Sequence, residues 1–310
     1  MTHIEERWIE REGGQKNYLR IWDVRQPKKG IVLIVTGMTE HVRRYDTFAR
    51  YLNQKGYLVA AADHRGQGQT ALRNGRLGNM EKGDFRRIVG DQKYYINMLR
   101  KEHGGLPVFM ICHSFGSFIG QKFIQKYSEK IDGIVLLGSL KHPKTKAVGG
   151  SVFLKPLALL TGRYFNSRLA NNLTFYNFNK KFENENSKFA WICSDEEVVR
   201  KYEKDPLCGY QVSNSFLMEL SKSVSQLYNI EQLRQIRKSL PILIMAGGAD
   251  PLNNRGKWVL DLFIMYRELG IKSVQLKLYD KMRHEVLNEI GKEQVFEQIF
   301  DFLEQSKKTK

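Results

Sequence analysis

The chain has 310 residues, of which 42% are hydrophobic and 27% are charged, and its formal net charge at pH 7 is +17. This composition is typical of a globular protein. Because the sequence has no long apolar run and no apolar N-terminal segment, we expect neither a membrane span nor a signal peptide. We therefore expect a cytoplasmic protein. The basic residues are interleaved with acids and carry no nucleic-acid-binding motif, so specific nucleic-acid binding is not expected, and three irregularly spaced cysteines argue against a disulfide scaffold.

The first half of the chain alternates predicted strands with predicted helices. Residues 4–23 predict a hairpin that turns at Gly13 and Gly14. Continuous apolar and β-branched runs then predict strands buried on both faces of a parallel sheet. These strands are 31–35, 57–62, 108–111 and 131–137, and the helices between them are about 45–55, 84–103 and 116–127. The repeated alternation predicts an α/β fold, with an open, mostly parallel sheet and helices on both faces.

A glycine-rich loop, DHRGQGQT, follows the second of these strands at residues 63–70. Loops of this kind can hold phosphate, but the spacing gives G-x-G without a third glycine where a dinucleotide site needs one. No helix is predicted to open directly on the loop. We therefore expect no dinucleotide, no other cofactor and no metal.

The alternation stops between residues 140 and 230. This segment has no clear buried strand and predicts short helices and loops, so we interpret it as a helical cap inserted over the sheet. Its aromatic residues are expected to form the cap's own core and in part to line a pocket; they include Phe153, Tyr164, Phe165, Phe175, Tyr176 and Phe178. The sheet resumes with strands 240–246 and 273–279, and helices are predicted near 256–269 and 292–303. The predicted core is thus formed by residues 1–139 and 231–310.

The stretch PVFMICHSFGSFIG, residues 107–120, predicts a strand, a tight turn and a helix with Ser114 at the turn. In such a turn the serine hydroxyl points away from the sheet, and the helix start directs free N–H groups to the place where an oxyanion would form. The usual pattern is G-x-S-x-G, and Cys112 replaces its first glycine. Alone the pattern is weak, because an ordinary strand-to-helix turn can contain a serine.

Two further polar residues strengthen the hypothesis. Ser114, Asp250 and His284 each follow the carboxyl end of a different predicted strand, the edge where open parallel sheets bind ligands. Serine needs a base within hydrogen-bond reach, imidazole titrates in the right range, and a carboxylate fixes the imidazole tautomer. Asp280 and Asp205 remain competitors for the acidic role.

A tetrahedral intermediate also needs donors for its oxyanion. We expect the backbone N–H of Phe115, which follows the serine, to be one donor. The loop after Val35 should supply the second, and Met38 is its best-placed amide.

Six strings in this order resemble the monoacylglycerol lipase and lysophospholipase group of α/β-hydrolases, which is also grouped with serine aminopeptidases. They are TGMTEHVRRYD, DHRGQGQT, CHSFGS, DPLCGY, GGADPLN and YDKMRHEVLNE. The resemblance implies the α/β-hydrolase fold, a triad of Ser114, Asp250 and His284, oxyanion donors at Met38 and Phe115, and a lid near residues 140–230. It also implies that Glu40, His41 and Arg44 brace the oxyanion loop. The chain departs from the group at Thr36, where histidine is usual, and at Cys112, where glycine is usual.

These inferences predict a serine hydrolase that cleaves carboxylic esters through an acyl-enzyme. The expected substrate is a monoacylglycerol, a lysophospholipid or a simpler ester, and the basic surface would favour peripheral contact with an anionic membrane or head group. One alternative is an aminopeptidase, which would need a cap acid such as Glu183, Glu185 or the cluster Asp195, Glu196 and Glu197 to hold an ammonium group. A second alternative is a binding protein that kept the scaffold without catalysis.

Overall fold

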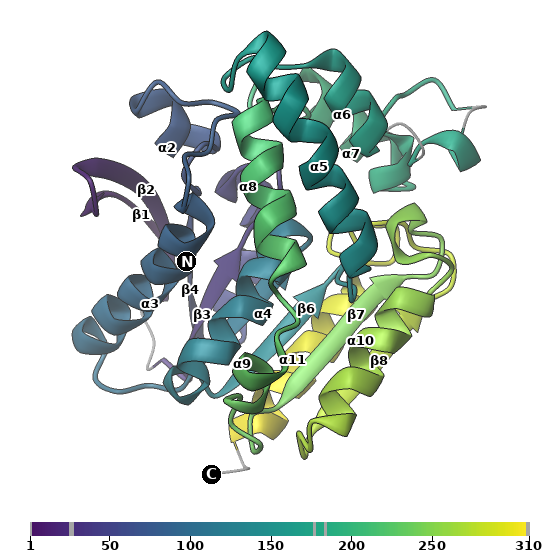
Figure 1. The fold of residues 1–310 in the computed structure, drawn as a ribbon. Helices are drawn as coiled ribbons and strands as arrows, with labels where there is room; N and C mark the ends of the chain where they lie inside the picture. The colour runs from purple at the N-terminus through teal and green to yellow at the C-terminus, as the bar shows by residue number, and fades with distance from the viewer. Residues whose placement is uncertain (1, 25–27, 176–177, 183–184, 308–310) are drawn as a thin grey trace.

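A single sheet of eight strands organises the molecule, in the order β1-β2-β4-β3-β5-β6-β7-β8. The computed structural model describes residues 2–24, 28–175, 178–182 and 185–307. Strands β1 and β2 form an antiparallel hairpin, and β2 pairs antiparallel with β4, whereas all pairings from β4 to β8 are parallel. The predicted α/β-hydrolase architecture is confirmed (Figure 1).

The predicted core strands agree with the observed ones to within two residues at each end. The strands are β1 (His3–Arg11), β2 (Gln15–Asp23), β3 (Gly30–Val35), β4 (Tyr57–Ala62), β5 (Val108–His113), β6 (Gly133–Leu137), β7 (Ile242–Gly247) and β8 (Val274–Tyr279). The α-helices are α1 (Asp46–Gln54), α2 (Gly68–Arg73), α3 (Asp84–Glu102), α4 (Phe115–Tyr127), α5 (Lys144–Thr161), α6 (Arg168–Phe175), α7 (Glu196–Lys204), α8 (Asn214–Ser225), α9 (Ile230–Arg234), α10 (Lys257–Glu268) and α11 (Glu293–Lys307).

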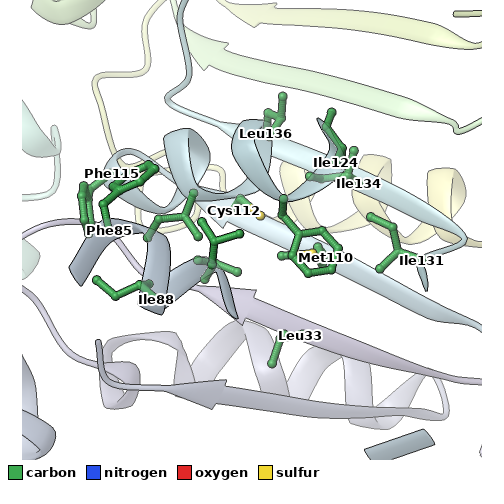
Figure 2. Packing of buried hydrophobic residues seen from close by; sticks show 14 of the residues in the cluster. Leu33, Phe85, Ile88, Met110, Cys112, Phe115, Ile124, Ile131, Ile134 and Leu136 are labelled. Carbon is green, nitrogen blue, oxygen red and sulfur yellow. The ribbon is translucent and has the colours of Figure 1, made fainter. Parts of the chain in front are cut away.

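Side chains of the central strands alternate between two hydrophobic clusters, one on each face of the sheet. On β3, Leu33 belongs to a cluster with α3, α4 and α10, whereas Ile34 belongs to a cluster with α1 and α11. Figure 2 shows part of the first cluster, including Leu33, Met110 and Cys112. Because successive strand residues point to opposite faces, a strand buried on both faces must be apolar throughout, as the sequence of β3 is.

The prediction that no helix opens on the glycine-rich loop is wrong, because the short helix α2 begins at Gly68. The carboxylate of Asp63 explains the tight loop: it accepts hydrogen bonds from the backbone N–H groups of Val42 at 2.9 Å and Gln69 at 2.7 Å. A side chain at Gly68 would collide with it, since an added Cβ would lie 2.2 Å from Asp63 Oδ2. Asp63 therefore joins the start of α2 to the loop after β3. Gly68 leaves the space that the carboxylate occupies.

The described residues of the segment 140–230, which we call the cap, form helices and loops, and α5 is 18 residues long rather than short. Helices α5 and α8 pack side by side above the carboxyl edge of the sheet (Figure 1). Tyr164 and Phe165 are exposed. The side chains of Phe153 and Phe175, and the whole of Tyr176, lie outside the described residues. None of the helices in the described part of the chain is long and apolar enough to cross a membrane.

Candidate active site

Ser114 lies at a sharp turn between β5 and α4, with φ 52° and ψ −115°. A non-glycine residue with positive φ is strained by about 1–3 kcal/mol, so the surrounding packing must hold it there. Gly116 permits that packing, because a Cβ at this position would lie 2.2 Å from the carbonyl oxygen of Val35. The turn therefore depends on α4 approaching the end of β3 without a side chain between them.

The cysteine that replaces the usual glycine is accommodated by a second glycine. Cys112 is buried under α4, and an added Cβ at Gly120 would lie 2.6 Å from its sulfur atom. Burial raises the pKa of the Cys112 thiol well above its ordinary value, so the group stays protonated and uncharged. Cys112 thus acts as a small packing residue of the turn.

The structure brings Ser114, His284 and Asp250 into one hydrogen-bonded series. His284 Nε2 lies 2.8 Å from Ser114 Oγ, and His284 Nδ1 lies 2.8 Å from Asp250 Oδ2. Burial alone would lower the pKa of His284, but the adjacent Asp250 carboxylate, together with the charges of Glu285 and Glu40, raises the pKa above its ordinary value. The imidazole is therefore held in one tautomer beside a hydroxyl and is poised to accept a proton.

Neither competing acid reaches His284 in the structure. Asp280 is exposed. Asp205 lies in the cap, where its Oδ2 is 2.9 Å from His41 Nε2. The geometry thus favours Asp250 as the partner of His284.

The loop after β3 presents its backbone to the same cavity. The amides on either side of Met38 are engaged: the N–H of Gly37 donates to Glu40, and the N–H of Thr39 donates to Gln67 Oε1 at 2.5 Å. Met38 lines the cavity that contains Ser114. Phe115 is the first residue of α4, where backbone N–H groups have no acceptor within the helix. The assignment of the Met38 and Phe115 amides as oxyanion donors stays a prediction.

Glu40 and Arg44 form a buried network behind this loop. Glu40 accepts hydrogen bonds from Gly37, from Tyr45 Oη at 2.7 Å and from Arg44 Nη1 at 2.7 Å. Burial opposes ionisation of Glu40, but His113, Arg44 and Tyr45 together keep its pKa below the ordinary value. Arg44 also donates to both oxygens of Glu285 at 2.6 Å, so it links the oxyanion loop to the residue after His284.

His41 and Thr36, two residues of the loop after β3, have contacts that the sequence does not predict. His41 contacts Asp205 of the cap, so it joins the oxyanion loop to the cap and not only to the core. Thr36 is buried, and its hydroxyl has no hydrogen-bond partner among the described residues, while its carbonyl lies 3.2 Å from His64 Nε2. Burial lowers the pKa of His64 to about 4, so this ring is neutral at physiological pH.

The cavity above Ser114 has a volume of about 440 Å³, within the range of small-ligand sites. The cap supplies much of its lining, notably Phe178, Trp191 and Tyr210. The centroid of the Trp191 ring lies 5.2 Å from that of His284. Trp191 cannot be identified as a site residue from the sequence, because no motif marks it and it lies 93 residues before His284.

One cluster in the described part of the chain has side chains of the kind that bind metals. Ligand atoms of His41, Asp205 and Cys208 lie within 4.8 Å of one another. However, the cleft beside them is also lined by Arg44, Lys201 and Lys292. The cleft also has acidic lining, from Asp195, Glu197 and Asp205. The hydrogen bond between His41 and Asp205 already satisfies two of the three groups, so we interpret the cluster as a contact between core and cap.

A family model and individual relatives both match this chain. The sequence model of the family described as serine aminopeptidase, S33 matches residues 26–291. The chain is 26% identical over 251 residues to the monoglyceride lipase of Rattus norvegicus, covering 80% of this chain and 74% of that protein. It is 25% identical over 294 residues to the monoacylglycerol lipase of Mycolicibacterium smegmatis, covering 94% of each.

Solved structures share the fold. A thermostable carboxyl esterase from Bacillus coagulans, determined in complex with glycerol, superposes with a TM-score of 0.89 at 24% identity, covering 98% of this chain and 99% of that chain. A soluble variant of the Saccharomyces cerevisiae monoglyceride lipase gives a TM-score of 0.74 at 20% identity, covering 99% of this chain and 95% of that one. Together with the family match over most of the sequence, these similarities mean that the chain belongs to the serine aminopeptidase, S33 family of α/β-hydrolases.

Proposed function

We propose that this protein hydrolyses carboxylic esters of monoacyl lipids through an acyl-enzyme formed on Ser114. His284 takes the serine proton as the hydroxyl attacks the ester carbonyl, and Asp250 orients the ring and stabilises the imidazolium. The amides of Met38 and Phe115 stabilise the oxyanion, and His284 returns its proton to the leaving alcohol. Water then repeats the sequence on the acyl-enzyme and releases the fatty acid.

The observation that carries this proposal is the series of two 2.8 Å contacts from Ser114 Oγ through His284 to Asp250. Ester hydrolysis is also what the names of the relatives describe, including the Rattus norvegicus monoglyceride lipase and the Mycolicibacterium smegmatis monoacylglycerol lipase. The protein is a carboxylic ester hydrolase. Its preference for monoacyl lipids is the finer part of the proposal.

The outer surface of the cap supports an action at a lipid surface. Leu159 and Leu160 at the end of α5 are 87% and 86% exposed, and Leu169 on α6 is also exposed. Lys155, Arg163 and Arg168 are exposed basic residues of the same segment. Apolar side chains among basic ones favour the interface of an anionic membrane, so we propose that the cap contacts the surface from which the substrate is drawn.

The aminopeptidase alternative is less well supported. It needs an unpaired acid to hold the substrate ammonium, but the two acids among the described lining residues, Glu40 and Glu285, both pair with Arg44. Glu185 pairs with Arg283, and Asp195 caps α7 by accepting from two backbone amides. Glu183 lies outside the described residues.

A substrate panel tests the proposal. Purified protein is assayed with monoacylglycerols, lysophospholipids, p-nitrophenyl esters and amino-acyl amides, next to Ser114→Ala. We expect turnover of the esters, covalent labelling of Ser114 by a fluorophosphonate, and loss of both in the variant. Equal ester turnover by wild type and Ser114→Ala would refute the acyl-enzyme, and faster turnover of the amides would favour the aminopeptidase.

A further inference from the structure

The loop that carries His284 is connected to the cap by hydrogen bonds on both sides of that residue. The N–H of Glu285 donates to the carbonyl of Ile192 at 2.8 Å. On the other side, the N–H of Arg283 donates to Glu289 Oε1 at 2.7 Å, and the same carboxylate accepts from the N–H of Ser194 at 3.1 Å. Hydrogen bonds therefore join the His284 loop to cap residues 190–194.

The side chain of Arg283 adds the most contacts to this connection. Its guanidinium donates to both oxygens of Glu185 at 2.8 and 2.5 Å, to the carbonyl of Ala190 at 2.6 Å and to the carbonyl of Cys193 at 3.1 Å. It also lies 4.1 Å from the centre of the Phe182 ring. The side chain is only 13% exposed. A planar group with five donors can make this set of contacts, which an ammonium cannot reproduce.

The two carbonyls that Arg283 binds lie on either side of the residue that covers His284. Ala190 begins the short 3-10 helix η4 (Ala190–Ile192), and Cys193 follows it. Trp191 projects from this turn onto His284, with ring centroids 5.2 Å apart and planes at 43°. Arg283 thus fixes both ends of the turn that places an indole against the imidazole.

We propose that Arg283 is a positioning residue for ester hydrolysis, which acts by holding Trp191 against the ring of His284. The cover restricts the imidazole to the orientation in which it reaches both Ser114 and Asp250. This inference rests on the proposed function. Glu185 is 40% exposed, so its ion pair is the outermost of these contacts, and the two carbonyl contacts should carry most of the positioning.

The test measures kcat and KM for a short soluble ester, with kcat expressed per Ser114 that a fluorophosphonate titrates to completion. We expect Arg283→Met to lower kcat per titrated site about tenfold, because small displacements of a catalytic group reduce rate steeply. Arg283→Lys should be intermediate, and Glu185→Gln should lose about twofold at most. Arg50→Met is the matched control, since Arg50 forms its ion pair with Asp46 within α1.

A double-mutant cycle separates positioning from a general structural role. If Arg283 acts through Trp191, Arg283→Met should cause little further loss of kcat per site in a Trp191→Ala background. The inference fails if Arg283→Met keeps its kcat per site within about twofold of wild type, or if its full loss persists without Trp191. Should Arg283→Met not fold, Arg283→Lys is measured in the same cycle with the same criteria. A wild-type protein without Ser114-dependent ester turnover would instead refute the proposed function.

Discussion

The turn at Ser114 and the cap segment over His284 are held in place in different ways. At the turn, backbone packs on backbone: Ser114 keeps its strained conformation because Gly116 lets α4 approach β3. In the cap segment, side chains bind loops, as Arg283 binds Ala190 and Cys193. The first arrangement has no alternative once the sheet has formed, whereas the second can open by breaking hydrogen bonds. We infer that the core holds Ser114 rigidly, whereas the position of His284 also depends on the hydrogen bonds between its loop and the cap.

Asp250→Asn is expected to have the largest effect on activity. The amide would leave His284 in the wrong tautomer, and losses of about 10⁴-fold in kcat are typical of this change. Measuring kcat for a p-nitrophenyl ester tests the assignment. Asp280→Asn is the control in the core, since Asp280 is exposed, and it should retain wild-type kcat. A small effect of Asp250→Asn together with a large effect of Asp205→Asn would place the acidic role in the cap and not in the core.

A pair of glycine substitutions compares the two regions in stability. Gly116→Ala places a methyl group 2.2 Å from the carbonyl of Val35, so we expect the free energy of unfolding to fall by about 3 kcal/mol. Gly149→Ala lies in α5 of the cap with nothing within 4 Å of the new atom, and should raise helix stability by about 0.5–1 kcal/mol. Denaturant titration measures both. Equal effects would mean that the turn at Ser114 is not the rigid element inferred here.

The sequence predicts the core well because its signals are local. A strand buried on both faces must be apolar throughout, and Ser114 was placed at the turn by its immediate neighbours. The contacts of Trp191 and Arg283 could not be predicted in this way, because they join segments about 90 residues apart without any periodic pattern. The helix after Gly68 cannot be predicted for a similar reason: its start is fixed by Asp63, which accepts hydrogen bonds from the N–H groups of Val42 and Gln69 only once the chain has folded.

The pH dependence of kcat/KM reports on the pKa of His284 without any substitution in the cap. His284 must be neutral to accept the serine proton, and its pKa is raised above 6.5 because Asp250, with Glu285 and Glu40, acts against the effect of burial. Activity should therefore fall as the pH drops through a midpoint above 6.5, by about tenfold per pH unit on the acid limb. A short ester that is itself stable over this range is the substrate. An acid limb centred well below 6.5 would contradict the strong coupling between His284 and Asp250.

The smallest effect on soluble substrate is expected from the outer face of the cap. Leu159→Ser with Leu160→Ser removes two of its exposed apolar side chains, so hydrolysis of monoacylglycerol in vesicles of phosphatidylcholine and phosphatidylglycerol should fall at least several-fold. Full burial of a leucine contributes about 1.5–3 kcal/mol, and a membrane interface buries each side chain only in part. Turnover of a short soluble ester should not change. Leu260→Ser provides the matched control, because Leu260 is an exposed leucine of the core helix α10. If both variants lose vesicle activity equally, the cap has no special role at the lipid surface. If the cap variant also loses soluble activity, the two leucines support the reacting groups and do not act only in contact with lipid.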